Sequence, residues 1–192
     1  LKDYDENIID NMIISPEETS AYTVVLNPPA TDRIFLHYPG PNDTFGAEDI
    51  DIKKIEEADI FHFGYPPLMK GMYTEAGKEL VNIYKKVKPK KLITSLDMSM
   101  PDPDSEAGRA DWPKILKKVL PLVDIFLPSI EEILFMLGYD NYNQKIENIS
   151  INLLEEIGDK LIDLGTKIVM IKLGAQGIYL QTAALDSSSF SL

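Results

Sequence analysis

Short apolar runs alternate with helix-like segments through most of this chain, and this alternation limits the possible folds more than any other feature. Two such runs, residues 92–96 and 123–127, are each followed by polar residues and then by a helical pattern. Continuous apolar strands separated by helices predict a mostly parallel sheet covered on both faces, which is an α/β fold. We expect strands at residues 59–63, 92–96, 123–127, 167–173 and 177–181, and helices at residues 75–88, 112–120, 130–137 and 151–164.

The first part of the chain has a different residue pattern. Residues 21–26 and 33–38 are strand-like, and the Asn/Pro-rich residues 27–32 between them predict a turn, so this part is expected to be a β-hairpin. We therefore divide the chain into a lid-type β segment with its connection, residues 1–48, and an α/β core, residues 49–192.

Composition narrows the possible partners. The chain has 192 residues with 31 acidic and 19 basic side chains, a net charge of −12, which argues against binding to nucleic acid or to anionic membranes. It has no cysteine, which excludes disulfides, thiolate catalysis and Cys-ligated zinc and favours the cytoplasm. No apolar run approaches the roughly 18 residues of a membrane span. We expect a cytoplasmic protein with a small-molecule partner.

Polar groups lie where the two central strands end. Asp97 ends one strand, and Ser129 and Glu132 follow the other at the start of a helix. In open α/β sheets this edge is where ligands bind. Ser129 and Glu132 fit a capping box, which explains them structurally. A carboxylate at this edge can also hold hydrated Mg²⁺ through water, so both roles remain open for Glu132.

A glycine-containing turn follows the strand at residues 167–173. Gly174 and Gly177 are consistent with a plain hairpin turn. The functional alternative is that small residues let a nucleotide approach the backbone while Lys172 supplies positive charge. Elsewhere, the lysines of residues 85–91 are expected to complement a helix dipole and stay solvated.

The segment from Asp43 to Asp49 is close to a known catalytic signature. It differs by one residue from Asp-Thr-x-Gly-Ala-Gly-Asp, in which backbone N–H groups form an anion hole and the last Asp is a catalytic base. Here Glu48 replaces a glycine, and its charge would repel a transferring phosphoryl group. We interpret the segment as a loop in which Asp49 caps a short helix over residues 50–57.

Five segments, in order and in register, resemble the ribokinase-like (PfkB) family of carbohydrate kinases. They are Tyr38-Pro39-Gly40-Pro41-Asn42-Asp43, Asp59-Ile60-Phe61-His62-Phe63-Gly64, Leu96-Asp97-Met98-Ser99, Asp124-Ile125-Phe126-Leu127-Pro128-Ser129-Ile130-Glu131-Glu132 and Ile171-Lys172-Leu173-Gly174-Ala175-Gln176-Gly177. The resemblance implies a three-layer α/β/α domain with a mostly parallel sheet and a small β-lid. It also implies transfer of the ATP γ-phosphoryl group to a sugar hydroxyl with Mg²⁺, and it makes a homodimer through the lid plausible.

The resemblance assigns a role to eight positions. Glu132 would organise Mg²⁺ and phosphate. The positions on the nucleotide side would be Ser129, Lys172, Gly174 and Gly177, and those on the sugar or phosphate side would be Asn42, Gly64 and Asp97.

This sequence departs from the family pattern in two places that bear on its activity and substrate. The late Asp-Thr-x-Gly-Ala-Gly-Asp segment is not found, so the catalytic residue stays unknown. We expect this chain to be the central portion of a kinase, incomplete at its C-terminal catalytic part and inactive alone. Asp97 is followed by Met98-Ser99 without the arginine typical of members acting on acidic keto-sugars, which favours a neutral sugar or polyol. The alternatives are a nucleoside kinase of the same fold and a non-catalytic sugar or nucleotide sensor.

Overall fold

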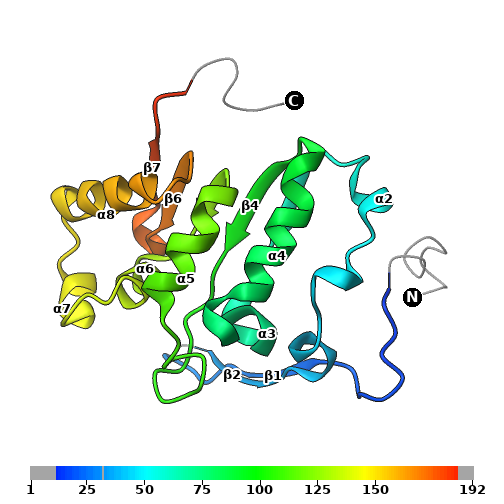
Figure 1. Ribbon diagram of the computed structural model, residues 1–192. Coiled ribbons are helices and arrows are strands. Elements are labelled where there is room, and N and C mark those ends of the chain that lie inside the picture. The colour runs from blue at the N-terminus through cyan, green and yellow to red at the C-terminus, as the bar shows by residue number, and fades with distance from the viewer. Residues whose placement is uncertain (1–11, 32, 186–192) are drawn as a thin grey trace.

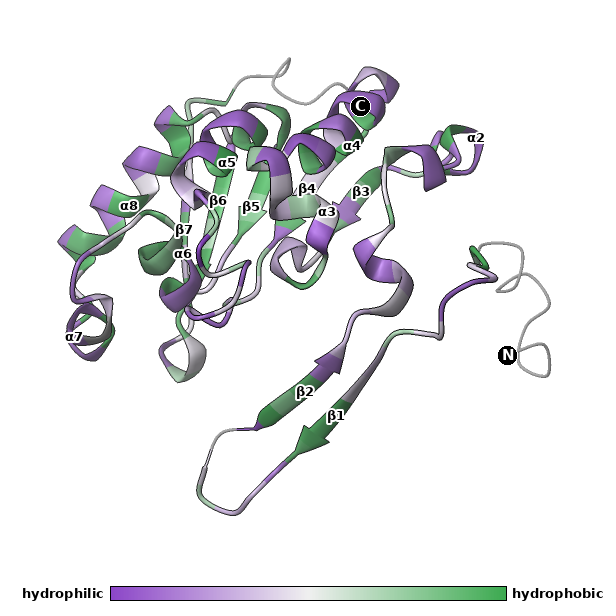
Figure 2. Ribbon diagram, turned by 60° about the horizontal axis from the view of Figure 1, so that its bottom comes forward, coloured by the Kyte–Doolittle hydropathy of each residue, from purple (hydrophilic) through white to green (hydrophobic). Residues whose placement is uncertain are grey.

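The computed structural model describes residues 12–31 and 33–185, which form two sheets and a set of helices (Figure 1). The smaller sheet is an antiparallel hairpin of β1 (Tyr22–Leu26) and β2 (Ile34–Tyr38). It projects away from the rest of the chain, as Figure 2 shows. Apolar side chains on both of its faces are exposed, among them Val25, Phe35 and Leu36.

The larger sheet has five strands in the order β3-β4-β5-β6-β7. Its first four strands are parallel, and β7 pairs antiparallel with β6. The strands are β3 (Ile60–Phe63), β4 (Ile93–Asp97), β5 (Ile125–Leu127), β6 (Ile168–Lys172) and β7 (Ile178–Thr182). The expected α/β fold with a mostly parallel sheet and a small separate β-hairpin is confirmed.

Helices connect the parallel strands in sequence. The α-helices are α2 (Ile52–Ile55), α3 (Lys70–Tyr73), α4 (Lys78–Val87), α5 (Trp112–Val119), α6 (Ile130–Met136), α7 (Tyr142–Glu147) and α8 (Ile151–Asp163). Short 3₁₀ turns fill several connections, including η1 (Gly40–Asp43), η2 (Ala47–Asp49), η3 (Pro66–Leu68), η4 (Thr74–Ala76) and η7 (Gly174–Gln176). Within the described residues, no helix is long and apolar enough to cross a membrane.

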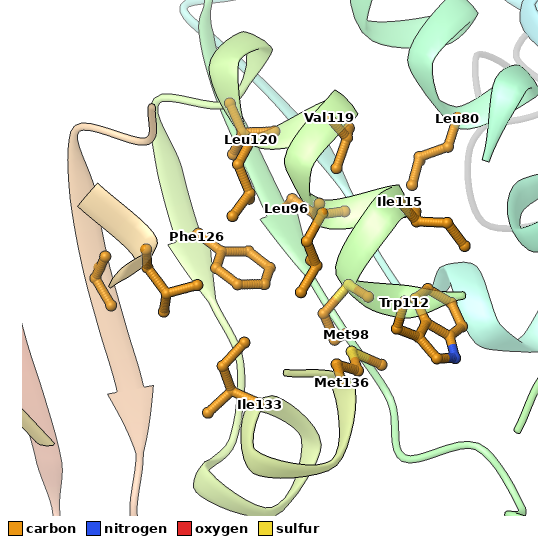
Figure 3. Close-up of a cluster of buried hydrophobic side chains, with 14 of the residues drawn as sticks. Leu80, Leu96, Met98, Trp112, Ile115, Val119, Leu120, Phe126, Ile133 and Met136 are labelled. Atoms are coloured by element: carbon orange, nitrogen blue, oxygen red, sulfur yellow. The ribbon is translucent and has the colours of Figure 1, made fainter. Parts of the chain in front are cut away.

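The helices that connect the parallel strands cover one face of the sheet. The strands follow one another in chain order, and crossovers between parallel strands are right-handed, so successive crossovers lie on the same side. Leu96 and Phe126 point to that side and are buried with Trp112 of α5 (Figure 3). On the opposite face of the edge strands, Ile60 and Leu180 are 53% and 57% exposed. Residues 12–31 and 33–185 thus supply one of the two expected helical layers.

Most predicted elements lie within two residues of the observed ones, and the exceptions have local causes. The helix expected from residue 75 begins at Lys78, because Glu75 and Gly77 have positive φ angles of 49° and 72°. Gly77 is also tightly packed, since a Cβ there would lie 2.7 Å from Ile115 Cγ2. The prediction that Asp49 caps the next helix is wrong: the Asp51 side chain caps α2, while Asp49 accepts a hydrogen bond from the Gly46 N–H.

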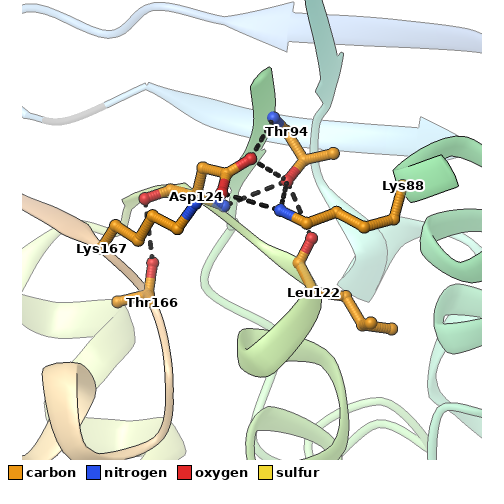
Figure 4. A network of polar contacts seen from close by, with 6 residues as sticks. All are labelled: Lys88, Thr94, Leu122, Asp124, Thr166 and Lys167. Atoms are coloured by element: carbon orange, nitrogen blue, oxygen red, sulfur yellow. Dashed lines mark hydrogen bonds and ion pairs between the residues drawn. The ribbon is translucent and has the colours of Figure 1, made fainter. Parts of the chain in front are cut away.

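A polar network ties the strands together at the edge where they begin (Figure 4). Buried Asp124 accepts bonds from Lys88 Nζ at 2.7 Å, Lys167 Nζ at 2.9 Å and the Thr94 N–H and hydroxyl, each at 2.9 Å. Burial raises the pKa of Asp124, but the bonds from Lys88, Thr94 and Lys167 outweigh it, and the pKa is lowered overall. The expectation that the 85–91 lysines remain solvated is therefore wrong for Lys88, and Lys90 likewise pairs with Glu56.

Candidate functional site

The carboxyl ends of the four parallel strands meet at one edge of the sheet, which we call the rim. Gly64 follows β3, Asp97 ends β4, Ser129 follows β5 and Lys172 ends β6. The strands are adjacent and parallel, so these residues lie side by side although they come from distant parts of the sequence. The structure therefore brings together most of the predicted site residues.

Ser129 and Glu132 are fixed by their own helix start. The Ser129 hydroxyl accepts a hydrogen bond from the Glu132 N–H at 3.3 Å, and Glu132 Oε2 accepts one from the Ser129 N–H at 2.6 Å. This reciprocal pair is the expected capping box at the N-terminus of α6. The capping role of both residues is confirmed, and it holds the Glu132 carboxylate at the rim in a defined position.

Lys172 and Asp97 form an ion pair across the rim. Lys172 Nζ lies 2.5 Å from Asp97 Oδ1, although 75 residues separate the two in sequence. The register pairs Asp97 with Leu127 of β5, and Lys172 with Ser129, so the lysine side chain reaches back across β5. The Lys172 backbone is held by a 2.9 Å hydrogen bond from its N–H to the Pro128 carbonyl.

The charges of the rim act on Glu132. Burial of this carboxylate raises its pKa, and the negative charge of Asp97 raises it further. The backbone hydrogen bond from Ser129 and the positive charge of Lys172 oppose this effect, but the pKa stays raised overall. Two carboxylates and one ammonium group thus interact within one small region, which carries a net negative charge.

The predicted glycines lie at the two ends of the rim. Gly174 and Gly177 have φ angles of 59° and 98°, and a Cβ on either would meet no atom within 4 Å. Their turn follows Lys172, and the Leu173 N–H donates to the Gly177 carbonyl at 2.9 Å. At the other end, Gly64 precedes Tyr65, whose N–H donates to the Asp97 carbonyl at 3.2 Å.

Asn42 is the one predicted site residue that the structure does not bring to this group. It lies in η1, and its N–H donates to the Pro39 carbonyl at 3.1 Å. In the described part of the chain, no hydrogen bond joins it to a rim residue. Its neighbour Asp43 instead ties η1 to α3, because Asp43 Oδ1 accepts from the Lys70 N–H at 2.8 Å.

Two features of the rim were missed from the sequence. The Lys172–Asp97 pair is one, since the resemblance assigns the two residues to different sides of the site. The other is Ser99, whose hydroxyl oxygen is buried without a hydrogen-bond partner among residues 12–31 and 33–185. Its position two residues after Asp97 was the available clue.

Other surfaces of the described chain are weaker candidates for a functional site than the rim. The described residues contain no group of three or more His, Cys, Asp or Glu side chains able to hold a metal ion unaided. One open hollow lies in the hairpin turn at residues 27–31, and another lies beside α7 and α8. Neither contains a rim residue, so the rim remains the candidate site because charges from three separate elements converge there.

Comparison with known proteins agrees with this architecture. The profile of the pfkB family carbohydrate kinases matches residues 4–189. An uncharacterized sugar kinase of Archaeoglobus fulgidus is 27% identical over 176 residues, which cover 92% of this chain and 60% of that protein.

Two solved structures share the fold. A putative ribokinase II from E. coli, in complex with ATP and Mg²⁺, has a TM-score of 0.59 at 20% identity, covering 88% of this chain and 49% of its own. Arabidopsis thaliana ribokinase, complexed with ribose and ATP, has a TM-score of 0.60 at 17% identity, covering 88% and 47%.

The chain thus spans between about half and three-fifths of the proteins that it matches. At these identities the structural matches show the fold alone. The profile match extends over nearly the whole sequence, and on that ground the chain belongs to the pfkB family of carbohydrate kinases.

Proposed function

We propose that this chain is the central part of an ATP-dependent kinase that phosphorylates a sugar hydroxyl. The observation that carries the proposal is the meeting of Asp97, Glu132 and Lys172 at the rim. Phosphoryl transfer is catalysed mainly by positioning and by neutralising phosphate charge, and the rim offers an ammonium donor beside oxygen ligands.

Mg²⁺ and ATP are the cofactors that this donor set fits. Mg²⁺ prefers oxygen ligands and usually keeps several waters, bound through one or two carboxylates together with substrate phosphates. Glu132 and Asp97 supply two carboxylates, which suits a hydrated ion completed by phosphate oxygens. When bound, the ion neutralises phosphate charge. Glu132 would hold it, and Ser129, Lys172, Gly174 and Gly177 would border the nucleotide.

The sugar would lie toward the other end of the rim. Gly64 and Asp97 would border it, and Asn42 would approach from η1. The loop after Asp97 carries exposed Asp102 and Asp104, which would repel a carboxylated sugar. We therefore propose a neutral sugar or polyol as the acceptor.

We further propose that the chain acts as part of a longer polypeptide and is inactive alone. The uncovered face of the sheet supports this, because its edge residues Ile60, Ile178 and Leu180 are more than half exposed. Exposed apolar side chains at both edges of one sheet face are typical of a surface where another polypeptide segment or a partner binds. The 192-residue chain should bind the dye ANS strongly, and the complete polypeptide should not; equal weak binding by both would contradict the proposal.

The central test is ligand-induced stabilisation. A ligand present at about 100 times its Kd stabilises a protein by about 2.7 kcal/mol, so ATP with Mg²⁺ should raise the melting temperature. Glu132→Gln should abolish this rise, whereas Glu131→Gln, at an exposed neighbouring position of the same helix turn, should keep it. A rise that survives Glu132→Gln would refute the assigned role.

Activity is tested on the complete polypeptide with a panel of sugars. A neutral sugar should be phosphorylated in preference to 2-keto-3-deoxygluconate. Preference for the acid would overturn the substrate class. A nucleoside acceptor would point to a nucleoside kinase of this fold, and binding without transfer would point to a sensor.

We also propose a homodimer through the hairpin. The register places Val24, Leu26, Ile34 and Leu36 on one face, and all four are exposed. Leu36→Glu should shift sedimentation of the protein toward the monomer, while Thr31→Glu in the hairpin turn should not. A monomeric wild type would end this proposal. Cytoplasmic location, expected from the absence of cysteine, is checked by cell fractionation.

A further inference from the structure

In the free protein, the Lys172 ammonium group is paired with the Asp97 carboxylate. Asp97 Oδ1 accepts both this bond and a 2.8 Å hydrogen bond from the Met98 N–H. Glu132 likewise uses Oε2 for the Ser129 N–H. Within the described residues, the second oxygen of each carboxylate makes no hydrogen bond. A single ammonium group therefore serves as counter-ion to two carboxylates that each keep one oxygen open.

The Lys172 side chain can leave its ion pair with Asp97 at little cost in free energy. Its backbone is fixed by the Pro128 carbonyl, so the flexible side chain alone has to move. The side chain is 39% exposed, and a pair this open to water is only weakly favourable overall. A phosphate group entering the rim offers the ammonium a stronger partner with more negative charge.

We infer that Lys172 is an exchangeable counter-ion, which occupies the Asp97–Glu132 pair in the free protein and moves to a phosphate when one enters. The vacated carboxylates then accept a divalent cation. This inference rests on the proposed function, and it adds an order of binding: the cation binds well only together with phosphate. It also changes the role of Lys172 from a simple nucleotide contact to a residue that couples two ligands.

The test is a titration with Mn²⁺ alone, followed by the electron paramagnetic resonance signal of the free ion. Lys172→Met should bind Mn²⁺ at least roughly tenfold more tightly than wild type, because a positive charge close to the cation is removed. Lys172→Arg should stay near the wild type. Lys85→Met, an exposed charge removal in the last turn of α4, is the matched control and should change nothing.

A second variant shows whether the lysine acts through Asp97. Adding Asp97→Asn to Lys172→Met should remove most of the gain in Mn²⁺ affinity. Circular dichroism of each variant verifies that it is folded. Equal Mn²⁺ affinity in wild type and Lys172→Met would overturn the inference, as would a gain that persists without Asp97.

A third experiment measures how strongly phosphate binding and Mn²⁺ binding favour each other. Tripolyphosphate should raise the Mn²⁺ affinity of wild type more than that of Lys172→Met, because only the wild type has a lysine to displace. Equal coupling in both proteins would overturn the inference. None of these readouts needs a sugar or phosphoryl transfer. Failure of the kinase proposal would appear as no turnover by the complete polypeptide with an intact Mn²⁺ response. Failure of the inference would appear as turnover by the complete polypeptide without that response.

Discussion

Replacing Asp124 by asparagine should destabilise the fold more than any other single change of charge in the described chain. Asp124 is 3% exposed and joins the start of β5 to Thr94 of β4, to Lys88 after α4 and to Lys167 before β6. Asparagine keeps the size of the side chain but removes its charge and replaces one acceptor oxygen by a donor, which would face a lysine or the Thr94 N–H.

The expected cost follows from these contacts. Breaking a buried ion pair by removing one partner costs about 3–5 kcal/mol. Here both lysine side chains are 33% exposed and regain water when the carboxylate is lost, which reduces the cost. We therefore expect the free energy of unfolding to fall by about 2–4 kcal/mol, a large part of the 5–15 kcal/mol typical of a whole protein.

Urea denaturation at pH 7, followed by circular dichroism, measures this loss. Asp140→Asn, an exposed position between α6 and α7, is the control and should change the free energy of unfolding by less than about 0.5 kcal/mol. A loss below about 1 kcal/mol for Asp124→Asn, or equal losses in both variants, would refute the reasoning that the network holds the three strands together.

Three further predictions concern pH, packing and capping. The pKa of Asp124 is lowered in the folded protein, so its carboxylate stabilises the fold fully above the unfolded aspartate pKa of about 3.9. This stabilisation is lost as pH falls through the folded-state pKa. The free energies of unfolding of wild type and Asp124→Asn, measured by urea titration, should therefore converge below about pH 4. Gly77→Ala should cost about 2–4 kcal/mol through positive φ and a collision with the core, whereas Gly138→Ala, with similar φ and open space, should cost only about 1 kcal/mol in the same assay. Ser129→Ala and Ser150→Ala each remove a helix cap and should each cost about 1 kcal/mol, but only Ser129→Ala should also weaken stabilisation by ATP with Mg²⁺; equal effects on nucleotide binding would contradict the site.

The sequence by itself determined the features that depend on near neighbours. Apolar periodicity predicted the strands, and the Ser129–Glu132 pair predicted a helix start, because a capping box closes within four residues. The expected helices over residues 130–137 and 151–164 stop before Gly138 and Gly165, and both glycines have the positive φ that helix ends of this kind require. The resemblance to one family rested on several such local segments in register, which is why the family could be predicted.

Only the tertiary structure decided the contacts between distant residues. Lys172 meets Asp97 because the order of the strands places β6 two positions from β4, and no local pattern encodes a pair 75 residues apart. The same holds for Lys88 and Asp124, where a lysine expected to be solvated is an internal counter-ion. Charge pairing of this kind follows from how the sheet is assembled, since the energy of two charges depends on their distance in space and not in sequence.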